Sequence, residues 1–365
     1  MRVVHLQLSG DPGGIVSLCY SIAQNSKNTN YMYFLFEGGA VAKEMKERGI
    51  PVIVSNSSRY RWRKSIKQFV RFCEEEKIDV VINHMNCPIA CAHVFGVKKY
   101  FPHIKIIGYM HSNQKNFLSN KKGKFFYVPL IRRMQRVCYK VVAISEFVKK
   151  TGMDTFMLES NKIEVIYNGI DCKKFEIQTK TNGKNEMNLI FVGRLIREKG
   201  VQFLIRAISQ LSQNTKVHLH IVGYGPMYEE LKELSEELHV DKRIVFWGKR
   251  MNIQEFLERA IFFVHPAICE EGFGITLVEA MAAGVPCIAY DGGAIPEIID
   301  HNVNGFLVEK GSVEKLTEQI EQAYDLYTDG QYEKMSRAAV EKAKMFDIRS
   351  MVQKLEALYS EEAVK

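Results

Sequence analysis

The sequence lacks any run of about 18 uncharged apolar residues, the length that a helix needs to cross a membrane. It also lacks a basic segment followed by an apolar stretch at its start, because residues 1–6 read directly into a strand. These absences argue against a membrane-spanning helix and against a secretory leader. We therefore expect a cytoplasmic protein.

The cysteines lack the spacing of a disulfide framework. The eight of them are scattered and lie mostly in apolar segments, which is typical of reduced thiols in a core. The densest group of potential metal ligands is His84, Cys87, Cys91 and His93. Its spacing matches no common zinc motif, and Pro88 favours a helix start within it. We therefore expect no metal at this group.

Composition places no unusual constraint on the fold, but the charge is unevenly distributed. The 365 residues, 46% apolar and 25% charged, suffice for two sizeable cores. Residues 1–172 carry 26 Lys and Arg against 13 Asp and Glu, whereas the remainder carries 24 against 29. The basic excess therefore belongs to the first half.

Short β-branched runs alternate with amphipathic stretches along the whole chain, which predicts parallel sheets covered by helices. In the first half the predicted strands are 3–8, 31–36, 52–54, 80–83, 104–109, 141–144 and 163–166. A polar stretch then interrupts the pattern. The second series comprises 189–192, 217–222, 244–247, 262–265, 287–289 and 305–308.

The fold class that follows is α/β, with two Rossmann-like, doubly wound parallel-sheet domains. We predict domains at 1–172 and 189–340, a linker at 173–188 and a C-terminal helix at 341–365 that crosses back to the first domain. Doubly wound sheets bind ligands at the carboxyl ends of their strands, so we expect a cleft between the two domains.

The strongest local signal is the segment 270–286, which follows the predicted strand 262–265. Gly272 and Gly274 let the backbone approach a ligand closely. A helix that begins near Thr276 directs free N–H groups and the positive end of its dipole at that ligand. The segment therefore predicts a phosphate site.

Two carboxylates flank this helix start. Glu271 in the loop and Glu279 about one turn into the helix are suited to accept hydrogen bonds from sugar hydroxyls. The segment from Thr276 to Glu279 is also a capping box, in which Glu279 serves only the helix. The sequence leaves both interpretations open.

Two further segments carry candidate ligands of an anionic group. Arg194, Arg197 and Lys199 follow the first strand of the second series, where cations suit a diphosphate, although a solvated surface turn is the alternative. Gly13 and Gly14 follow the first strand of the chain and precede an apolar-faced stretch at 15–23, which predicts a second glycine loop.

Taken in order, these motifs resemble the family-four retaining glycosyltransferases of GT-B fold. The resemblance rests on Gly13 and Gly14, on 168–171, on Gly193 and Arg194 with Lys199 and Gly200, on 223–226, and on Glu271 with Glu279. The motifs extend over nearly the whole chain. The first domain is then expected to hold the acceptor and the second the nucleotide-sugar donor.

The resemblance also implies a role for each matching residue. Arg194 and Lys199 bind the donor diphosphate and stabilise the departing nucleotide, Glu279 holds the ribose, and Glu271 holds sugar hydroxyls near C3. His111 lies near the sugar C6 hydroxyl and the reacting centre, with a satisfied strand-end histidine as the alternative. The segment 247–249 reads the base. The implied catalytic residues are Glu271, His111, Arg194 and Lys199. The implied donor-binding set is Gly13, Gly14, Arg194, Lys199, Gly223, Lys249, Glu271, Gly272, Phe273, Gly274, Ile275, Thr276, Leu277 and Glu279.

Metal-dependent glycosyltransferases hold a cation with an Asp-x-Asp pair, and this sequence contains no such pair. Arginine, lysine and the helix end are therefore expected to stabilise the leaving diphosphate without a metal or other cofactor.

The basic first half contains two segments, 59–64 and 121–133, that interleave cations with large aromatic residues. On one surface they would suit anionic lipid headgroups, with an ordinary solvated face as the alternative. No nucleic-acid recognition module is visible, so we expect no nucleic-acid partner.

The function that these observations favour is transfer of a sugar from a UDP-type donor, with retention, so that an α-glycosidic bond forms. The expected acceptor is a lipid-linked or other surface glycan at the cytoplasmic face of a bacterial membrane, in polysaccharide biosynthesis for the cell envelope. A nucleotide-sugar epimerase of the same architecture is one alternative, but it should lack the paired Glu271 and Glu279. A catalytically silent partner subunit is the other.

Overall fold

The computed structural model describes residues 1–55, 62–119, 121–177, 186–250 and 252–360. The chain forms two compact units. Unit 1 comprises Met1–Gly169 and Ile348–Lys365, and unit 2 comprises Ile170–Asp347. Of the linker predicted at 173–188, residues 178–185 lie outside the described residues.

Unit 1 is built on a seven-stranded parallel sheet with the order β3-β2-β1-β4-β5-β6-β7. Its strands are β1 (Arg2–Ser9), β2 (Thr29–Glu37), β3 (Val52–Val54), β4 (Val80–Asn83), β5 (Lys105–Met110), β6 (Lys140–Ala143) and β7 (Ile163–Val165). Each of the seven strands predicted in the first half is confirmed, with ends that differ by at most two residues. They are predictable because strands buried on both faces are nearly continuous apolar runs.

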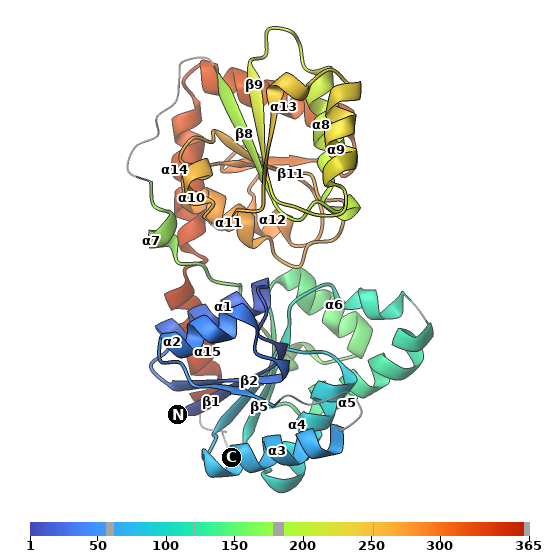
Figure 1. Cartoon of the computed structure of the whole chain (residues 1–365), viewed down its shortest axis with the longest axis vertical. Helices are drawn as coiled ribbons and strands as arrows, with labels where there is room; N and C mark the ends of the chain where they lie inside the picture. Colours follow the sequence, from blue (N-terminus) through green and yellow to red (C-terminus); the bar gives the residue numbers. More distant parts are fainter. Residues whose placement is uncertain (56–61, 120, 178–185, 251, 361–365) are drawn as a thin grey trace. The chain divides into compact units, whose positions relative to one another are not determined.

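Helices cover both faces of this sheet (Figure 1). They are α1 (Gly14–Asn25), α2 (Gly39–Glu47), α3 (Trp62–Glu75), α4 (Pro88–Tyr100), α5 (Val128–Val137), α6 (Glu146–Phe156) and α15 (Ile348–Ser360), with short helical turns η1 (Gln114–Leu118), η2 (Gly123–Tyr127) and η3 (Ser160–Lys162). The helix start predicted at Pro88 is confirmed.

Helix α15 comes from the end of the chain and packs on unit 1. The Oε1 atom of Glu356 accepts hydrogen bonds from Ser26 Oγ at 2.6 Å and from Asn28 Nδ2 at 3.0 Å. Lys105 Nζ donates to the carbonyl oxygen of Tyr359 at 2.8 Å. Together with the buried Met351, Leu355 and Leu358 on its inner face, these bonds explain why the helix belongs to unit 1.

Unit 2 contains a six-stranded parallel sheet with the order β10-β9-β8-β11-β12-β13. Its strands are β8 (Met187–Val192), β9 (Val217–Val222), β10 (Ile244–Gly248), β11 (Phe262–His265), β12 (Cys287–Tyr290) and β13 (Gly305–Val308). Its helices are α7 (Cys172–Phe175), α8 (Val201–Gln210), α9 (Tyr228–Glu237), α10 (Gln254–Leu257), α11 (Ile275–Ala282), α12 (Ile295–Ile298), α13 (Val313–Thr328) and α14 (Tyr332–Lys344), with short turns η4 (Arg197–Lys199) and η5 (Asp241–Arg243). All six strands predicted in this half are confirmed.

Both sheets reverse their strand order at one point. In unit 1 the chain runs outward from β1 through β2 to β3 and then returns to β4 on the other side of β1. In unit 2 β8 takes the place of β1, with β9 on one side and β11 on the other. Open parallel sheets bind ligands at the carboxyl ends of the strands that flank such a reversal. The fold therefore predicts that ligands bind at the loops after β1, β4, β8 and β11.

Among the described residues, no helix combines the length and the apolar character that a membrane span requires.

Candidate functional site

The loop after β11 leads into α11, whose first turn is open to a ligand. The helix begins at Ile275, and Gly274 is its N-cap with φ of +107°. The amide of Leu277 donates to the carbonyl oxygen of Gly274 at 3.0 Å, which leaves the amides of Ile275 and Thr276 without an intrahelical acceptor. Two N–H groups at the positive end of a helix dipole suit a phosphate or a sugar oxygen.

The capping-box interpretation of Thr276 is wrong. Thr276 is the second residue of α11, and the N-cap is Gly274, which has no side chain. Glu279 therefore does not occupy the position from which a capping-box carboxylate reaches back to the N-cap amide. The positive φ of Gly274 lets the helix begin two residues earlier than a threonine cap at 276 would allow.

The structure brings Glu271 and Lys199 together, although 72 residues separate them in the sequence. Lys199 Nζ donates to Glu271 Oε1, and this ion pair is largely shielded from solvent. The buried His265, at the end of β11, places its Nε2 atom 3.4 Å from the same carboxylate oxygen. Burial raises the pKa of Glu271, but His265 and Lys199 outweigh it and hold the pKa at about 2. The carboxylate is thus ionised at every physiological pH.

Lys199 is placed by a glycine that no other residue can replace without distortion. Gly200 follows it with φ of +74°, and a Cβ atom there would lie 1.7 Å from the carbonyl oxygen of Pro266. This close approach joins the turn after β8 to the turn after β11. Gly223, at the end of β9, is equally constrained, because a Cβ atom there would lie 1.8 Å from the carbonyl oxygen of Gly193. The two glycines let three loops of unit 2 approach one another closely.

Glu279 lies in a small cavity of unit 2 that also contains Thr276. The cavity, of about 200 Å³, is lined by Lys174, Phe175, Val192, Asn252, Ile253, Gln254, Thr276 and Glu279. Burial raises the pKa of Glu279 to about 7, against a smaller lowering by Lys174. A carboxyl group with few charged neighbours in a cavity is a candidate to bind hydroxyl groups.

The remaining predicted donor residues of unit 2 are more exposed. Arg194 follows β8, is exposed and forms no ion pair with another described residue. Lys249 is exposed after β10, where Gly248 has φ of +67°. Its neighbour Trp247 lines a different cavity, of about 280 Å³, with His220 and Phe256.

Unit 1 contributes a second loop and helix start. Gly13 is the N-cap of α1 and Gly14 is its first residue, and both are exposed. The amide of Ser17 donates to the carbonyl oxygen of Gly13 at 3.0 Å, so the first amides of α1 lack an intrahelical acceptor. His111 directly follows β5 and is half-buried, and its Nε2 atom lies 2.9 Å from His84 Nδ1.

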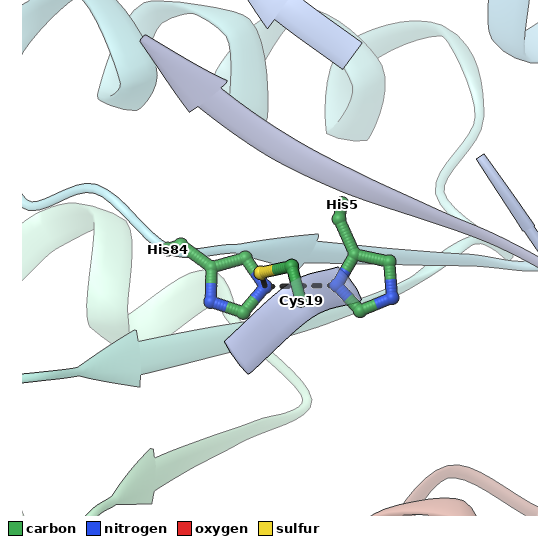
Figure 2. Close-up of side chains that lie close together, drawn as sticks. All are labelled: His5, Cys19 and His84. Carbon is green, nitrogen blue, oxygen red and sulfur yellow. Dashed lines mark hydrogen bonds between the residues drawn. The ribbon is translucent and has the colours of Figure 1, made fainter. Parts of the chain in front are cut away.

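One group of potential metal ligands stands out within the described parts of the chain. His5, Cys19 and His84 are buried, and their ligand atoms lie within 4.8 Å of one another (Figure 2). Of the four potential ligands considered in the sequence, at positions 84, 87, 91 and 93, this group contains only His84. His93 instead bonds to Ser65 Oγ at 2.8 Å and to the carbonyl oxygen of Ile89 at 2.7 Å.

An apolar cavity of unit 1 adjoins the second basic segment. It has a volume of about 700 Å³ and is lined by Leu8, Phe36, Trp62, Asn86, Cys87, Pro88, Ile89, Ala92, Phe117 and Tyr127. Tyr127 ends η2, in which Phe125 and Phe126 are 64% and 71% exposed. Lys122 Nζ lies 5.7 Å from the ring centre of Tyr127. In the first basic segment, residues 59–61 lie outside the described residues.

Three neighbours of site residues were not predicted from the sequence: His265 beside Glu271, and His5 and Asn30 beside the histidines of unit 1. His265 could have been predicted, because it is the last residue of a predicted strand at the point of sheet reversal. His5 could not, because the sequence does not show which residue contacts a histidine inside an apolar strand.

Both halves of the chain match family models of glycosyltransferases. Residues 12–174 match the family model Glycosyltransferase Family 4, and residues 173–344 match Glycosyl transferases group 1. An uncharacterized glycosyltransferase of Methanocaldococcus jannaschii is 34% identical over 46% of this chain and 46% of its own length. The N-acetyl-alpha-D-glucosaminyl L-malate synthase of Bacillus anthracis is 28% identical over 78% of this chain and 75% of its own length.

Solved structures share the fold over the whole chain. Anabaena HepE in complex with UDP has a TM-score of 0.85 at 21% identity and covers 99% of this chain and 100% of its own. The same protein has also been solved with UDP-glucose, with a TM-score of 0.81.

Proposed function

Because the chain belongs to the family-four retaining glycosyltransferases of GT-B fold, we propose that it transfers a hexose from a UDP-sugar to a glycan acceptor. The observation that carries this proposal is the ionised Lys199–Glu271 pair beside the open first turn of α11. The complexes of HepE with UDP and with UDP-glucose support a uridine nucleotide as the donor.

In the proposed reaction the bond between C1 of the sugar and the diphosphate oxygen breaks, and its electron pair leaves with UDP. A new bond forms between a hydroxyl oxygen of the acceptor and C1, on the face that UDP leaves, and the hydroxyl proton passes to an oxygen of the departing diphosphate. Arg194, Lys199 and the amides of Ile275 and Thr276 stabilise the negative charge that develops on the diphosphate. Because the sequence lacks an Asp-x-Asp pair, we propose that these groups do so without a metal.

In this proposal the two carboxylates bind hydroxyl groups on different parts of the same donor molecule. Glu271, ionised and fixed by Lys199 and His265, accepts hydrogen bonds from the donor sugar. Glu279, in its own cavity, accepts them from the ribose of the nucleotide. A ligand that donates two hydroxyl hydrogens favours the ionised form of Glu279, so donor binding lowers its raised pKa.

We propose that unit 1 binds the acceptor and that this acceptor is lipid-linked. The apolar cavity beside η2 suits an alkyl or prenyl chain, and the exposed Phe125 and Phe126 suit the lipid interface. Lys121, Lys122 and Lys124 are exposed in and just before η2 and suit anionic headgroups, each contributing about 1 kcal/mol. The protein then works on a cytoplasmic membrane surface in the synthesis of envelope polysaccharide.

The donor half of the proposal is tested by thermal stabilisation of the purified full chain. Free ligand stabilises a native protein according to its affinity, by about 2.7 kcal/mol at 100 times Kd. We expect UDP and one UDP-hexose to raise the melting temperature and release of UDP to follow. Stabilisation by GDP-sugars or ADP-sugars but not by UDP-sugars would contradict the proposal.

The acceptor half requires a separate assay. The malate synthase of Bacillus anthracis is named for a small acid acceptor, so a water-soluble acceptor is the outcome to test against. We expect transfer of radiolabelled sugar to a lipid extract and none to malate or to free monosaccharides. Transfer to malate at a comparable rate would overturn the lipid-linked acceptor and leave the UDP-sugar donor standing.

A further inference from the structure

Three histidines and an asparagine form a hydrogen-bonded chain across the sheet of unit 1. Asn30 lies on β2, His5 on β1, His84 directly after β4 and His111 directly after β5. These four strands are neighbours in the sheet. Asn30 Oδ1 lies 3.0 Å from His5 Nε2, His5 Nδ1 lies 2.9 Å from His84 Nε2, and His84 Nδ1 lies 2.9 Å from His111 Nε2.

The rings lie end to end, as in-line N–H···N hydrogen bonds require. The ring centres are 5.2 Å apart both for His5 with His84, at 14° between planes, and for His84 with His111, at 26°. Each separation exceeds the nitrogen–nitrogen distance by 2.3 Å, which is close to the sum of the two ring radii. Figure 2 shows His5 and His84 facing one another through single nitrogens. Two nitrogens that bind one tetrahedral metal ion would instead point at a common centre, at an angle to each other.

Burial keeps all three rings uncharged. It lowers the pKa of His5 to about 4 and that of His111 to about 3, and it lowers the pKa of His84 well below its ordinary value. A neutral imidazole carries one N–H and one bare nitrogen. In a chain of three in-line neutral rings, the three N–H groups must therefore all point the same way along the chain.

Asn30 selects one of the two directions. Its Nδ2 atom donates to the carbonyl oxygen of Asn28 at 2.8 Å, which leaves Oδ1 facing His5. An amide oxygen only accepts, so His5 Nε2 carries the proton and His5 Nδ1 is bare. His84 Nε2 then donates to His5, and His111 Nε2 donates to His84. The reverse direction would set a bare nitrogen against Oδ1, and turning the amide over would set Oδ1 against the carbonyl oxygen of Asn28.

Further hydrogen bonds fix Asn28, the residue whose carbonyl group orients the amide of Asn30. Asn28 Oδ1 accepts from the N-terminal amine of Met1 at 2.9 Å, and Asn28 Nδ2 donates to Glu356 of α15 at 3.0 Å. Cys19 Sγ lies 3.3 Å from His84 Nε2 and is a second, weak acceptor for that N–H group. At the other end, Nδ1 of His111 forms no hydrogen bond within the described part of the chain.

We propose that Asn30, His5 and His84 are positioning residues that fix His111 as the tautomer with a proton on Nε2 and a bare Nδ1. The bare nitrogen is then a permanent acceptor for a substrate hydroxyl, and it repels a carboxylate oxygen. This inference rests on the proposed function and on the role that the family resemblance implies for His111, near the C6 hydroxyl of the transferred sugar. The tautomer itself is a property of the free protein and is measured without substrate.

Long-range ¹H–¹⁵N correlation of the 365-residue chain, labelled at its ten histidines, distinguishes protonated from bare ring nitrogens. His111→Gln identifies the signals of His111 by their loss. We expect a bare Nδ1 and a protonated Nε2 from pH 6 to 8. A proton on Nδ1 of His111, a charged ring, or stoichiometric bound zinc with metal-shifted His5 and His84 signals would overturn the proposal.

Paired variants separate tautomer control from structural support. His5→Gln retains an acceptor for His84 and a donor for Asn30, whereas His5→Leu retains neither. We expect His5→Gln to keep the His111 tautomer and kcat within about twofold, and His5→Leu to show both tautomers and lose about tenfold in kcat with little change in KM. Equal behaviour of the two variants would overturn the proposal.

His93→Gln is the matched control for burial. His93 is a buried histidine of the same unit, but its bonds to Ser65 and Ile89 lie outside the chain. We expect its loss to lower the melting temperature without moving the signals of His111. If His5→Leu fails to fold, the wild-type spectrum and His5→Gln still decide. A protein with the expected tautomer but no transferase activity would overturn the proposed function and leave the tautomer control standing.

Discussion

The two units differ in the electrostatic state of the polar side chains that follow their strands: one holds them charged and the other neutral. In unit 2 Glu271 lies against Lys199 and His265, which hold its pKa at about 2, so the pair is charged. In unit 1 no opposite charge among the described residues acts on His84 and His111, and burial keeps both rings neutral, so their hydrogen bonds set the positions of protons. Glu271 and His84 follow strands that flank the reversal of their sheets, and His111 follows the next strand, β5. A shared architecture thus supports two electrostatic solutions, and the presence of a counter-charge decides between them.

The largest effect on turnover is expected from removal of the Lys199 charge. Lys199→Ala removes the cation that we assign to the leaving diphosphate, so turnover should fall by about 100-fold or more. Arg197→Ala is the control, because Arg197 lies in the same turn, is exposed and pairs with Glu230 at 3.6 Å. We expect the control to stay within about twofold. Near-normal turnover of a folded Lys199→Ala protein would remove Lys199 from the site.

A smaller effect is expected at Glu279, a carboxyl group of unit 2 that forms no ion pair with another described residue. Its pKa of about 7 in the folded protein exceeds the ordinary 4.5, so the folded state binds this proton more tightly than the unfolded state. Its contribution to stability is full below pH 4.5 and is lost as the pH rises through 7. Glu279→Gln, which cannot ionise, should therefore stabilise the free enzyme at pH 8 by roughly 2 kcal/mol, a value reduced for partial exposure.

The same variant should bind the donor less well, because an amide accepts hydroxyl hydrogens more weakly than a carboxylate does. Wild-type affinity for UDP should rise between pH 6 and 8 as Glu279 ionises, while the variant should show no such rise. Thermal melts at several pH values and calorimetric titration with UDP measure the two effects. Unchanged stability and unchanged affinity together would leave Glu279 without the role proposed.

The smallest effect concerns the membrane surface of unit 1. Cosedimentation with liposomes should increase with the fraction of anionic lipid and fall with salt, because exposed charges are screened beyond about 8 Å at physiological ionic strength. Lys121→Gln with Lys122→Gln should weaken binding severalfold. Lys149→Gln with Lys150→Gln, an adjacent pair on α6, is the control. Equal binding to neutral and anionic vesicles, or to neither, would favour a water-soluble acceptor.

The strands of both sheets could be predicted from the sequence because buried parallel strands leave continuous apolar runs, as in β4 and β11. The loops could be located because they follow those runs. The roles of the individual site residues remain predictions. The pairing of Lys199 with Glu271 could not be derived from the residues alone, because it depends on the close approach of Gly200 to Pro266.

Other features were beyond the sequence for a different reason. Thr276 fits a capping box equally well until the positive φ of Gly274 is known. The direction of the histidine chain depends on the amide orientation of Asn30, which the carbonyl of Asn28 sets. Neither a backbone angle nor an amide orientation can be predicted from the spacing of residues in the sequence.

In the proposed reaction protein cations and a helix end, without a metal, stabilise the leaving nucleotide. Release of UDP from the UDP-hexose that stabilises the protein should therefore be measured with and without excess EDTA. We predict the same rate in both conditions, and at least about a 100-fold lower rate for Lys199→Ala in both. A rate that collapses in EDTA and returns with magnesium or manganese would contradict the account.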